Sequence, residues 1–160
     1  MKRYPEYLGT IANDEIKTLL PKIQPHSKIA FIINTDDHEG PGVHWKAIYI
    51  DATPGGSQSC ELFDSFGRDF SPQVMRDLSL VIDMLRPASY LKLKINRVVH
   101  QFDDTNTCGY HAANFLIDRL RGKTFVDATG FNPTAKIHGE ENYWENKINT
   151  LKEEHKFGYI

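Results

Sequence analysis

The sequence predicts an α+β fold in which a central mixed, largely antiparallel sheet packs against the helix that carries Cys108. Between residues 28 and 64, three short apolar stretches alternate with turn-forming residues, as in an antiparallel meander. Segments 71–85 and 108–121 instead repeat apolar residues at helical spacing, so peripheral helices are expected beside the sheet. With 160 residues, the chain is expected to form a single domain over residues 1–160.

The first element expected is a short helix that follows Asn13. Asparagine is a frequent helix cap, and the apolar residues after it recur at helical spacing. Pro21 falls within this pattern, so the regular helix is expected to end early, with Ile23 in the exit. Residues 1–10 are polar and show no clear period.

Three strands are expected next. Residues 28–34 (KIAFIIN) have the β-branched content of a buried strand. Residues 44–50 (HWKAIYI) follow a turn-rich acidic loop, and strand alternation places Trp45 and Lys46 on opposite faces. Residues 59–64 (SCELFD) form the third strand of the expected meander.

The second half of the chain is expected to be mainly helical. Ser71-Pro72 is a helix-start signal, so a helix is expected over 71–85. Residues 91–100 read as one strand or two short ones, and the Cys108 helix is expected to stop at Gly122. Residues 125–138 are expected to be irregular, and 139–156 to form a very polar amphipathic helix.

Composition excludes several classes of protein. The formal net charge of -2 gives no general case for a nucleic-acid binder, and no apolar run is long enough to span a membrane. The first residues also lack the apolar stretch of a signal peptide. Two cysteines without a C-x-x-C pair argue for a reducing compartment and against a structural metal. No metal or cofactor is therefore expected.

Cys108 is the candidate nucleophile. It is expected in the first turn of a helix, where unpaired backbone N–H groups and the positive end of the helix dipole favour a thiolate. The alternative is that Cys108 is a small buried apolar residue, as most free cysteines are. Position alone does not decide between these readings, so the rest of the chain must supply the other parts of a site.

A cysteine protease also needs a base, a group that orients the base, and donors for the oxyanion. His44, Asp64 and Gln101 each stand at the end of an expected strand, where side chains from distant sequence can converge with Cys108. Each has an alternative interpretation. His44 could be a half-exposed strand histidine, Asp64 could begin a turn, and Gln101 could be a loop amide that bonds backbone groups.

Other histidines compete with His44 for the role of base. His111 lies near Cys108 along the same helix, but at a poor angle for pairing with the thiol. His100 alternates away from Gln101 on its strand. His44 is therefore favoured.

Short motifs in a fixed order resemble those of a known protease family. They are GVHW at 42–45, LFDSFG at 62–67 and Q-x6-CG at 101–109, with LGT at 8–10 and INT at 33–35. This order is similar to that of the adenovirus maturation protease (adenain) and its relatives. Those relatives include proteases that remove ubiquitin-like modifiers and the maturation proteases of virophages and Polinton/Maverick-type elements. The resemblance covers most of the chain, and it is closest to the viral branch.

The resemblance implies the fold of that family and a role for each matching residue. The implied site residues are His44 as general base, Asp64 as its orienting carboxylate, Cys108 as nucleophile, Gln101 as oxyanion-hole donor, and Trp45 with Gly109 as substrate-binding residues. The adenovirus enzyme has glutamate where this chain has Asp64, whereas the modifier-removing branch has aspartate. Either carboxylate can hold an imidazole. For Trp45, a core-facing strand tryptophan remains the alternative.

The implied function is a cysteine endopeptidase that cleaves viral capsid or precursor proteins at glycine-containing sites during virion maturation. The expected setting is the virion and the interior of the host cell, with a monomeric enzyme and no membrane partner. The alternative is removal of ubiquitin or a ubiquitin-like modifier. The short stretch before residue 8 leaves little room for a modifier-docking surface. A non-catalytic binding module and acetyl transfer are less favoured.

Two family properties are not carried over. The adenovirus enzyme is activated by a peptide held through a disulfide to a cysteine before the glutamine motif. Residues 87–100 contain no cysteine, and Cys60 lies in a different strand, so an activating peptide, if used, is not expected to bind covalently. A DNA-binding surface is not evident at this net charge, although a local patch at Lys92, Lys94 and Arg97 stays open.

Overall fold

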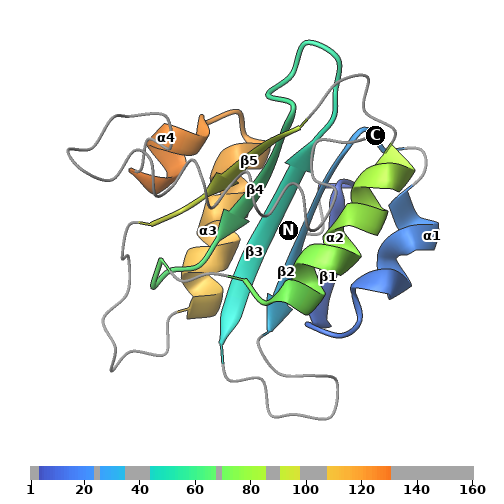
Figure 1. The fold of residues 1–160 in the computed structure, drawn as a ribbon. Coiled ribbons are helices and arrows are strands. Elements are labelled where there is room, and N and C mark those ends of the chain that lie inside the picture. Colours follow the sequence, from blue (N-terminus) through green and yellow to red (C-terminus); the bar gives the residue numbers. More distant parts are fainter. Residues whose placement is uncertain are drawn as a thin grey trace, which may run out of the picture.

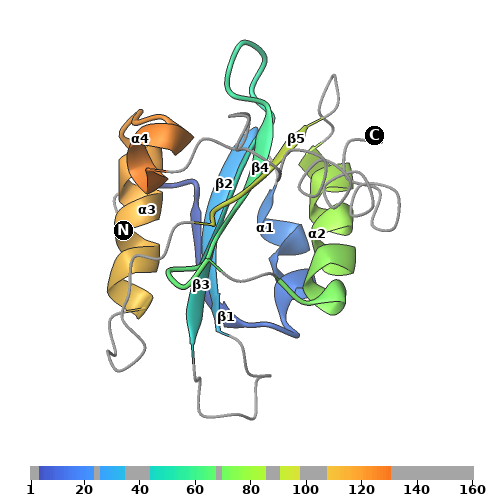
Figure 2. The same cartoon turned by 60° about the vertical axis from the view of Figure 1, so that its left-hand side comes forward.

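The computed structural model describes residues 4–23, 26–34, 44–67, 70–85, 91–97 and 108–130. Within them, a five-stranded sheet lies between two helical layers (Figures 1 and 2). Helices α3 (Cys108–Leu120) and α4 (Phe125–Thr129) cover one face, and α1 (Leu20–Ile23) and α2 (Pro72–Leu85) cover the other. The predicted α+β class is confirmed. The helix predicted over 139–156 and the end of the strand predicted over 91–100 lie outside the described residues.

The sheet is mixed, with strand order β1-β2-β3-β4-β5. Its antiparallel centre is the predicted meander of β2 (Lys28–Asn34), β3 (Trp45–Asp51) and β4 (Ser59–Phe63), with bounds within one residue of those expected. Both outer pairings are parallel, since β1 (Tyr7–Ala12) runs beside β2 and β5 (Lys92–Ile95) beside β4.

Strand alternation divides the core into two clusters. Ile48 on β3 faces the α2 layer, where it packs with other β-branched and leucine side chains. Ala47 and Tyr49 face the α3 layer and pack around Phe115. Strand β3 lies in the middle of the sheet, so it is covered on both faces and its side chains position the layers relative to one another.

The start of the chain differs from the sequence prediction. Residues Tyr7–Ala12 form the edge strand β1, although they show no regular alternation. The pairing with β2 shifts register between Tyr7 and Thr10, and Gly9 lies between them at φ +114°. This left-handed conformation suits glycine, and the local irregularity hides the period of two on which strand recognition depends.

The predicted first helix is also corrected. Glu15, not Asn13, precedes the first turn, which is a 3-10 helix, η1 (Ile16–Leu19), and α1 continues from Leu20. Pro21 is the second residue of α1 and does not end a helix, because a first-turn residue needs no backbone N–H donor. Ile23 is therefore helical and fully buried in the core.

Helix α4 lies where irregular structure was expected. Thr124 caps it by accepting a hydrogen bond from Asp127 N at 3.1 Å, and Gly130 ends it in the left-handed conformation. The threonine-x-x-aspartate spacing and the following glycine are sequence signals that could have identified this short helix. Among the described residues, no helix combines the length and apolar character needed to cross a membrane.

Candidate active site

The register of β3 and β4 brings three polar side chains to one end of the sheet. Ala47 pairs with Phe63, so continuing the antiparallel register by one residue places Lys46 opposite Asp64. His44 lies two residues from Lys46 and on the same side of its strand. Residues far apart in the sequence therefore meet because two neighbouring strands run in opposite directions.

His44 and Asp64 form a direct pair. The Nε2–H group of His44 donates to Asp64 Oδ1 at 2.5 Å, since an ionised carboxylate can only accept. His44 is 8% exposed and Asp64 is fully buried, so the bond is largely shielded from water. Because Asp64 occupies Nε2, Nδ1 is the ring nitrogen left for a nucleophile.

Asp64 is fixed by its own turn as well as by the histidine. The backbone N–H of Phe66 donates to Asp64 Oδ1 at 3.0 Å, and the Asn96 side chain donates to the Asp64 carbonyl oxygen at 3.0 Å. Lys46 Nζ lies 3.5 Å from Asp64 Oδ2. Asp64 therefore both begins a turn, as its alternative interpretation proposed, and pairs with His44.

The surroundings of Asp64 keep its carboxyl group ionised. Burial alone would raise its pKa, but the hydrogen bonds from His44 and the Phe66 N–H, together with the positive charge of Lys46, lower the pKa below its usual value. A negative charge is therefore held beside the imidazole at neutral pH, which is what stabilising an imidazolium requires.

The start of α3 lies against the start of β3. Trp45 Cδ1 would be 3.6 Å from a Cβ atom added to Gly109, so the indole ring packs on the glycine backbone. The start of α3 and the start of β3 lie at the same end of the sheet (Figure 1). Cys108 is the first residue of α3, and His44 directly precedes β3. The Cys108 side chain and Gln101 lie outside the described residues.

The contact also bears on both interpretations of Trp45. Its side chain is partly buried and packs against the α3-side core, as a strand tryptophan would. It also borders Gly109, beside the candidate nucleophile. Trp45 can therefore pack in the core and also lie next to the candidate nucleophile.

Aromatic packing mounts α3 on the sheet. Phe115 stacks on Phe63 of β4 with ring centroids 4.8 Å apart, and Phe125 of α4 meets it edge-on at 6.1 Å. Ala112 and Leu116 are buried on the same side of the helix. The expected apolar stripe of the helix is thus the face that packs on the sheet, which makes α3 a rigid support for its first residue.

A buried ion pair, which the sequence did not reveal, fastens the other end of α3. Arg119 donates to both carboxylate oxygens of Glu61 on β4, at 2.6 and 2.8 Å. Ser59 donates to the same carboxylate, and the guanidinium lies 4.6 Å from the centre of the Tyr49 ring. Burial would lower the pKa of Arg119, but the Glu61 carboxylate raises it above its usual value. The only sequence signal was a glutamate within an otherwise buried strand.

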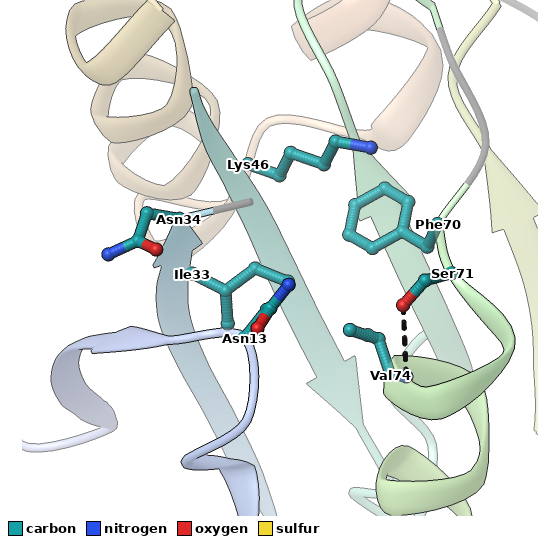
Figure 3. A pocket seen from close by; sticks show the side chains of 7 residues that line it. All are labelled: Asn13, Ile33, Asn34, Lys46, Phe70, Ser71 and Val74. Carbon is teal, nitrogen blue, oxygen red and sulfur yellow. Dashed lines mark hydrogen bonds between the residues drawn. The ribbon is translucent and has the colours of Figure 1, made fainter. Parts of the chain in front are cut away.

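A second missed residue is Lys46, which lies beside the His44–Asp64 pair. It lines a pocket of about 290 Å³ between the sheet and the start of α2 (Figure 3). The pocket residues come from several elements and, apart from the lysine, are uncharged: Asn13, Ile33, Asn34, Lys46, Phe70, Ser71 and Val74.

His111, the competing histidine, lies on α3. Its ring packs edge-on against the exposed Tyr110, with centroids 5.9 Å apart. Within the described ranges, no cluster of three histidine, cysteine or acidic side chains is arranged to hold a metal ion.

Comparison with known proteins identifies viral relatives, although no family model matches the chain. Protein R355 of Acanthamoeba polyphaga mimivirus, named as a thiol protease, is 28% identical over 104 residues, covering 61% of this chain and 32% of R355. Cysteine protease S273R of African swine fever virus (isolate Tick/Malawi/Lil 20-1/1983) is 30% identical over 105 residues, 64% of this chain and 38% of S273R. In isolate Pig/Kenya/KEN-50/1950, S273R is named SUMO-1 cysteine protease; it is 30% identical over 122 residues, 75% of this chain and 42% of that protein.

Crystal structures of the S273R protease share the architecture described above. One, of the selenomethionine protein, matches 99% of this chain and 63% of that chain with a TM-score of 0.59 and 17% identity. Another matches 86% of this chain and 45% of that chain, with a TM-score of 0.53 and 21% identity. The fold is that of the S273R protease. This chain spans only 32% to 42% of the length of its curated relatives, all of which are viral and named as cysteine or thiol proteases.

Proposed function

We propose that this protein is a cysteine endopeptidase in which Cys108 is the nucleophile, His44 its base, and Asp64 the group that orients the base. The observation that carries the proposal is the buried 2.5 Å hydrogen bond between His44 and Asp64, at the end of the sheet where α3 begins. The relatives named as viral cysteine proteases support the same chemistry.

The proposed reaction follows from the chemistry of these groups. The Cys108 thiolate attacks the scissile carbonyl carbon, and the carbonyl electron pair moves to the oxygen as the S–C bond forms. The side-chain amide of Gln101 and the backbone N–H of Cys108 donate hydrogen bonds to that oxyanion. His44, which holds the proton of the former thiol, transfers it from Nδ1 to the leaving amine nitrogen as the C–N bond breaks.

The second half of the reaction releases the acyl group. His44 Nδ1 takes a proton from water, and the resulting hydroxide attacks the thioester carbonyl. The C–S bond then breaks and Cys108 leaves as a thiolate, so the product acid and the starting enzyme are formed. Throughout, Asp64 holds Nε2 and stabilises the protonated ring without taking the proton itself.

The substrates we propose are viral capsid or precursor proteins, cleaved at glycine-containing sites during virion maturation. On this proposal the chain belongs to the viral, adenain-like branch and acts as a monomer within the virion or the infected cell. Trp45 and Gly109 would flank the small residues of the substrate, because the indole already packs against the glycine backbone. Similarity to viral cysteine or thiol proteases supports the protease activity on which this proposal depends.

Activation through a disulfide is not part of the proposal. Cys60 is fully buried within β4, and burial raises the pKa of its thiol well above the usual value. A buried, protonated thiol is a poor partner for an incoming peptide. An activating peptide would therefore have to bind without a covalent link to Cys60.

A second candidate function is removal of a ubiquitin-like modifier. S273R proteins of some isolates carry the name SUMO-1 cysteine protease, which favours this candidate specifically. A panel of ubiquitin and ubiquitin-like fluorogenic conjugates, set against glycine-containing peptides from viral capsid proteins, separates the two. Faster cleavage of a conjugate than of every capsid peptide would favour modifier removal.

Replacement of the nucleophile tests the proposed chemistry. We expect Cys108→Ala to abolish peptide cleavage, while the matched variant Cys60→Ala, which alters the other cysteine, keeps activity at the wild-type level if it folds. Circular dichroism should show that both variants are folded. Cleavage by folded Cys108→Ala at the wild-type rate would refute the assignment.

A further inference from the structure

Lys46 is a charged residue on an apolar face of the sheet. It pairs across the strands with Ile33, and the next residue on its face of β3 is Ile48, both fully or almost fully buried. Lys46 itself is only 8% exposed. Lysine is seldom buried unless it is paired, because an ammonium group loses its hydration inside the protein.

The ammonium group of Lys46 lies between a carboxylate and an aromatic ring. Its Nζ is 3.5 Å from Asp64 Oδ2 and 4.7 Å from the centre of the Phe70 ring. The two oxygens of Asp64 are therefore divided, since Oδ1 bonds His44 and the Phe66 N–H while Oδ2 faces the lysine. Such a division resists rotation of the carboxylate.

The pocket explains how a lysine can remain charged at this position. Figure 3 shows the side chain of Lys46 running along one wall toward Phe70, with Asn13 and Ile33 on another side. The open volume of about 290 Å³ keeps one side of the chain within reach of solvent. The lysine faces one acidic group, Asp64, which directly follows β4, and His44 is the titratable group two residues before it in the chain. The other residues that line the pocket, from β2, from the start of α2 and from the segment after β1, are uncharged.

We propose that Lys46 is a positioning residue of the active site, which fixes the Asp64 carboxylate beside His44 and thereby influences the alkaline limit of activity. This inference rests on the proposed protease function and adds a further side chain to it. Lys46 does not touch the peptide bond; it acts through Asp64.

The sign of the effect follows from the charges. A protonated His44 and Lys46 are both positive and share the Asp64 carboxylate, so each weakens the attraction between the carboxylate and the other. Removing the lysine charge strengthens the electrostatic attraction between the Asp64 carboxylate and a protonated His44. The alkaline limb of the pH profile of kcat/KM should then move upward, by about half a pH unit or more for charges separated by a single carboxylate.

The experiment is the pH dependence of kcat/KM for a glycine-containing peptide, measured on the full chain. Lys46→Met removes the charge but keeps an unbranched chain that suits the apolar face, and Lys46→Arg keeps the charge. Lys94→Met is the matched control, because Lys94 is a half-buried lysine on β5 whose charge faces the Phe125 ring of α4. We expect the alkaline limb of the profile to move upward in Lys46→Met alone.

An unshifted alkaline limb in Lys46→Met, or an equal shift in Lys46→Arg, would overturn the role of Lys46. Lys46→Gln, which also removes the charge, replaces Lys46→Met if that variant does not fold, and the same shift is expected. Cys108→Ala is run in the same assay to separate the two claims. Residual cleavage by Cys108→Ala would refute the protease assignment. If Cys108→Ala is inactive but the alkaline limb of Lys46→Met is unshifted, only the positioning role of Lys46 is refuted.

Discussion

At the scale of single residues, the site depends on a carboxylate that serves several partners at once. Asp64 accepts hydrogen bonds from His44 and the Phe66 N–H, and faces Lys46 with its second oxygen. The carboxylate therefore orients the imidazole, closes a turn and balances a buried ammonium. Changing it should affect catalysis and stability in ways that can be measured separately.

We expect Asp64→Asn to lower kcat/KM by at least about a hundredfold, because the amide preserves the shape of the side chain but removes the charge that stabilises the imidazolium. Asp77→Asn on α2 is the matched control, since Asp77 is also buried but bonds only Gln73 in the described contacts. Steady-state kinetics of the wild type, Asp64→Asn and Asp77→Asn measure the loss of kcat/KM in each variant. Equal losses in both variants would point to a general effect of removing a buried carboxylate.

The stability of the same variant should depend on pH with a definite sign. The pKa of Asp64 is lowered in the folded protein, so its ionisation stabilises the fold above the usual carboxyl pKa of 3.8, and this contribution is lost as the pH falls through the folded value. Urea denaturation should show Asp64→Asn less stable than wild type at pH 7, with a smaller difference below about pH 4. A difference that grows on acidification would contradict this linkage.

His44 and Asp64 could be predicted from the sequence because they stand at strand ends in motifs that resemble a known family. Lys46 and Glu61 could not, because alternation along a strand gives the face of a side chain but not its partner. The charge of Lys46 faces a carboxylate that follows a different strand, and Glu61 meets an arginine 58 residues later in the chain. Only the register and the packing of the layers bring such pairs together.

At the scale of elements, α3 is held at both ends by different interactions. Its first turn packs against Trp45, and its last turn is tied to β4 by Arg119 and Glu61. Phe115 fills the space between them by stacking on Phe63. The helix is thus fixed along its length, so that its first residue has a defined place relative to β3.

We expect Arg119→Met to destabilise the protein by about 3–5 kcal/mol, because it leaves Glu61 buried without its partner. The double variant Glu61→Leu/Arg119→Met removes both charges and should recover most of that loss. The free energy of unfolding from urea titration tests both expectations. A double variant as unstable as the single one would show that packing, and not the unpaired charge, sets the cost.

The elements with a regular apolar period were predicted well, whereas two short ones were missed. Helix α2 and strands β2 and β3 follow their patterns within about one residue of the expected bounds. Strand β1 contains a glycine at positive φ that breaks the alternation, and α4 is too short for a helical period to show. Such segments adopt their structure through pairing and capping instead of through periodicity.

At the scale of the whole molecule, the layers bring the candidate residues to one end of the sheet. Helix α3 covers one face of the sheet (Figure 2). Lys46 and the pocket lie on the other face, and the His44–Asp64 pair lies where β3 begins and β4 ends. The fold agrees with that of the S273R protease, in which this chain corresponds to about half of the solved chains. Sequence motifs predicted this class, but they did not predict which interactions join the layers.

The proposed mechanism requires Cys108 and His44 to form a reactive thiolate–imidazolium pair. The most direct test is the rate of Cys108 alkylation by iodoacetamide at pH 6, followed by peptide mass spectrometry in the wild type and in His44→Ala, with Cys60 as the internal control. We predict rapid alkylation of Cys108 in the wild type and almost none of the buried Cys60. In His44→Ala, alkylation of Cys108 should be at least about tenfold slower, because the thiolate is no longer stabilised by the imidazolium. Equal alkylation rates at Cys108 in the wild type and in His44→Ala would show that the two residues do not form such a pair.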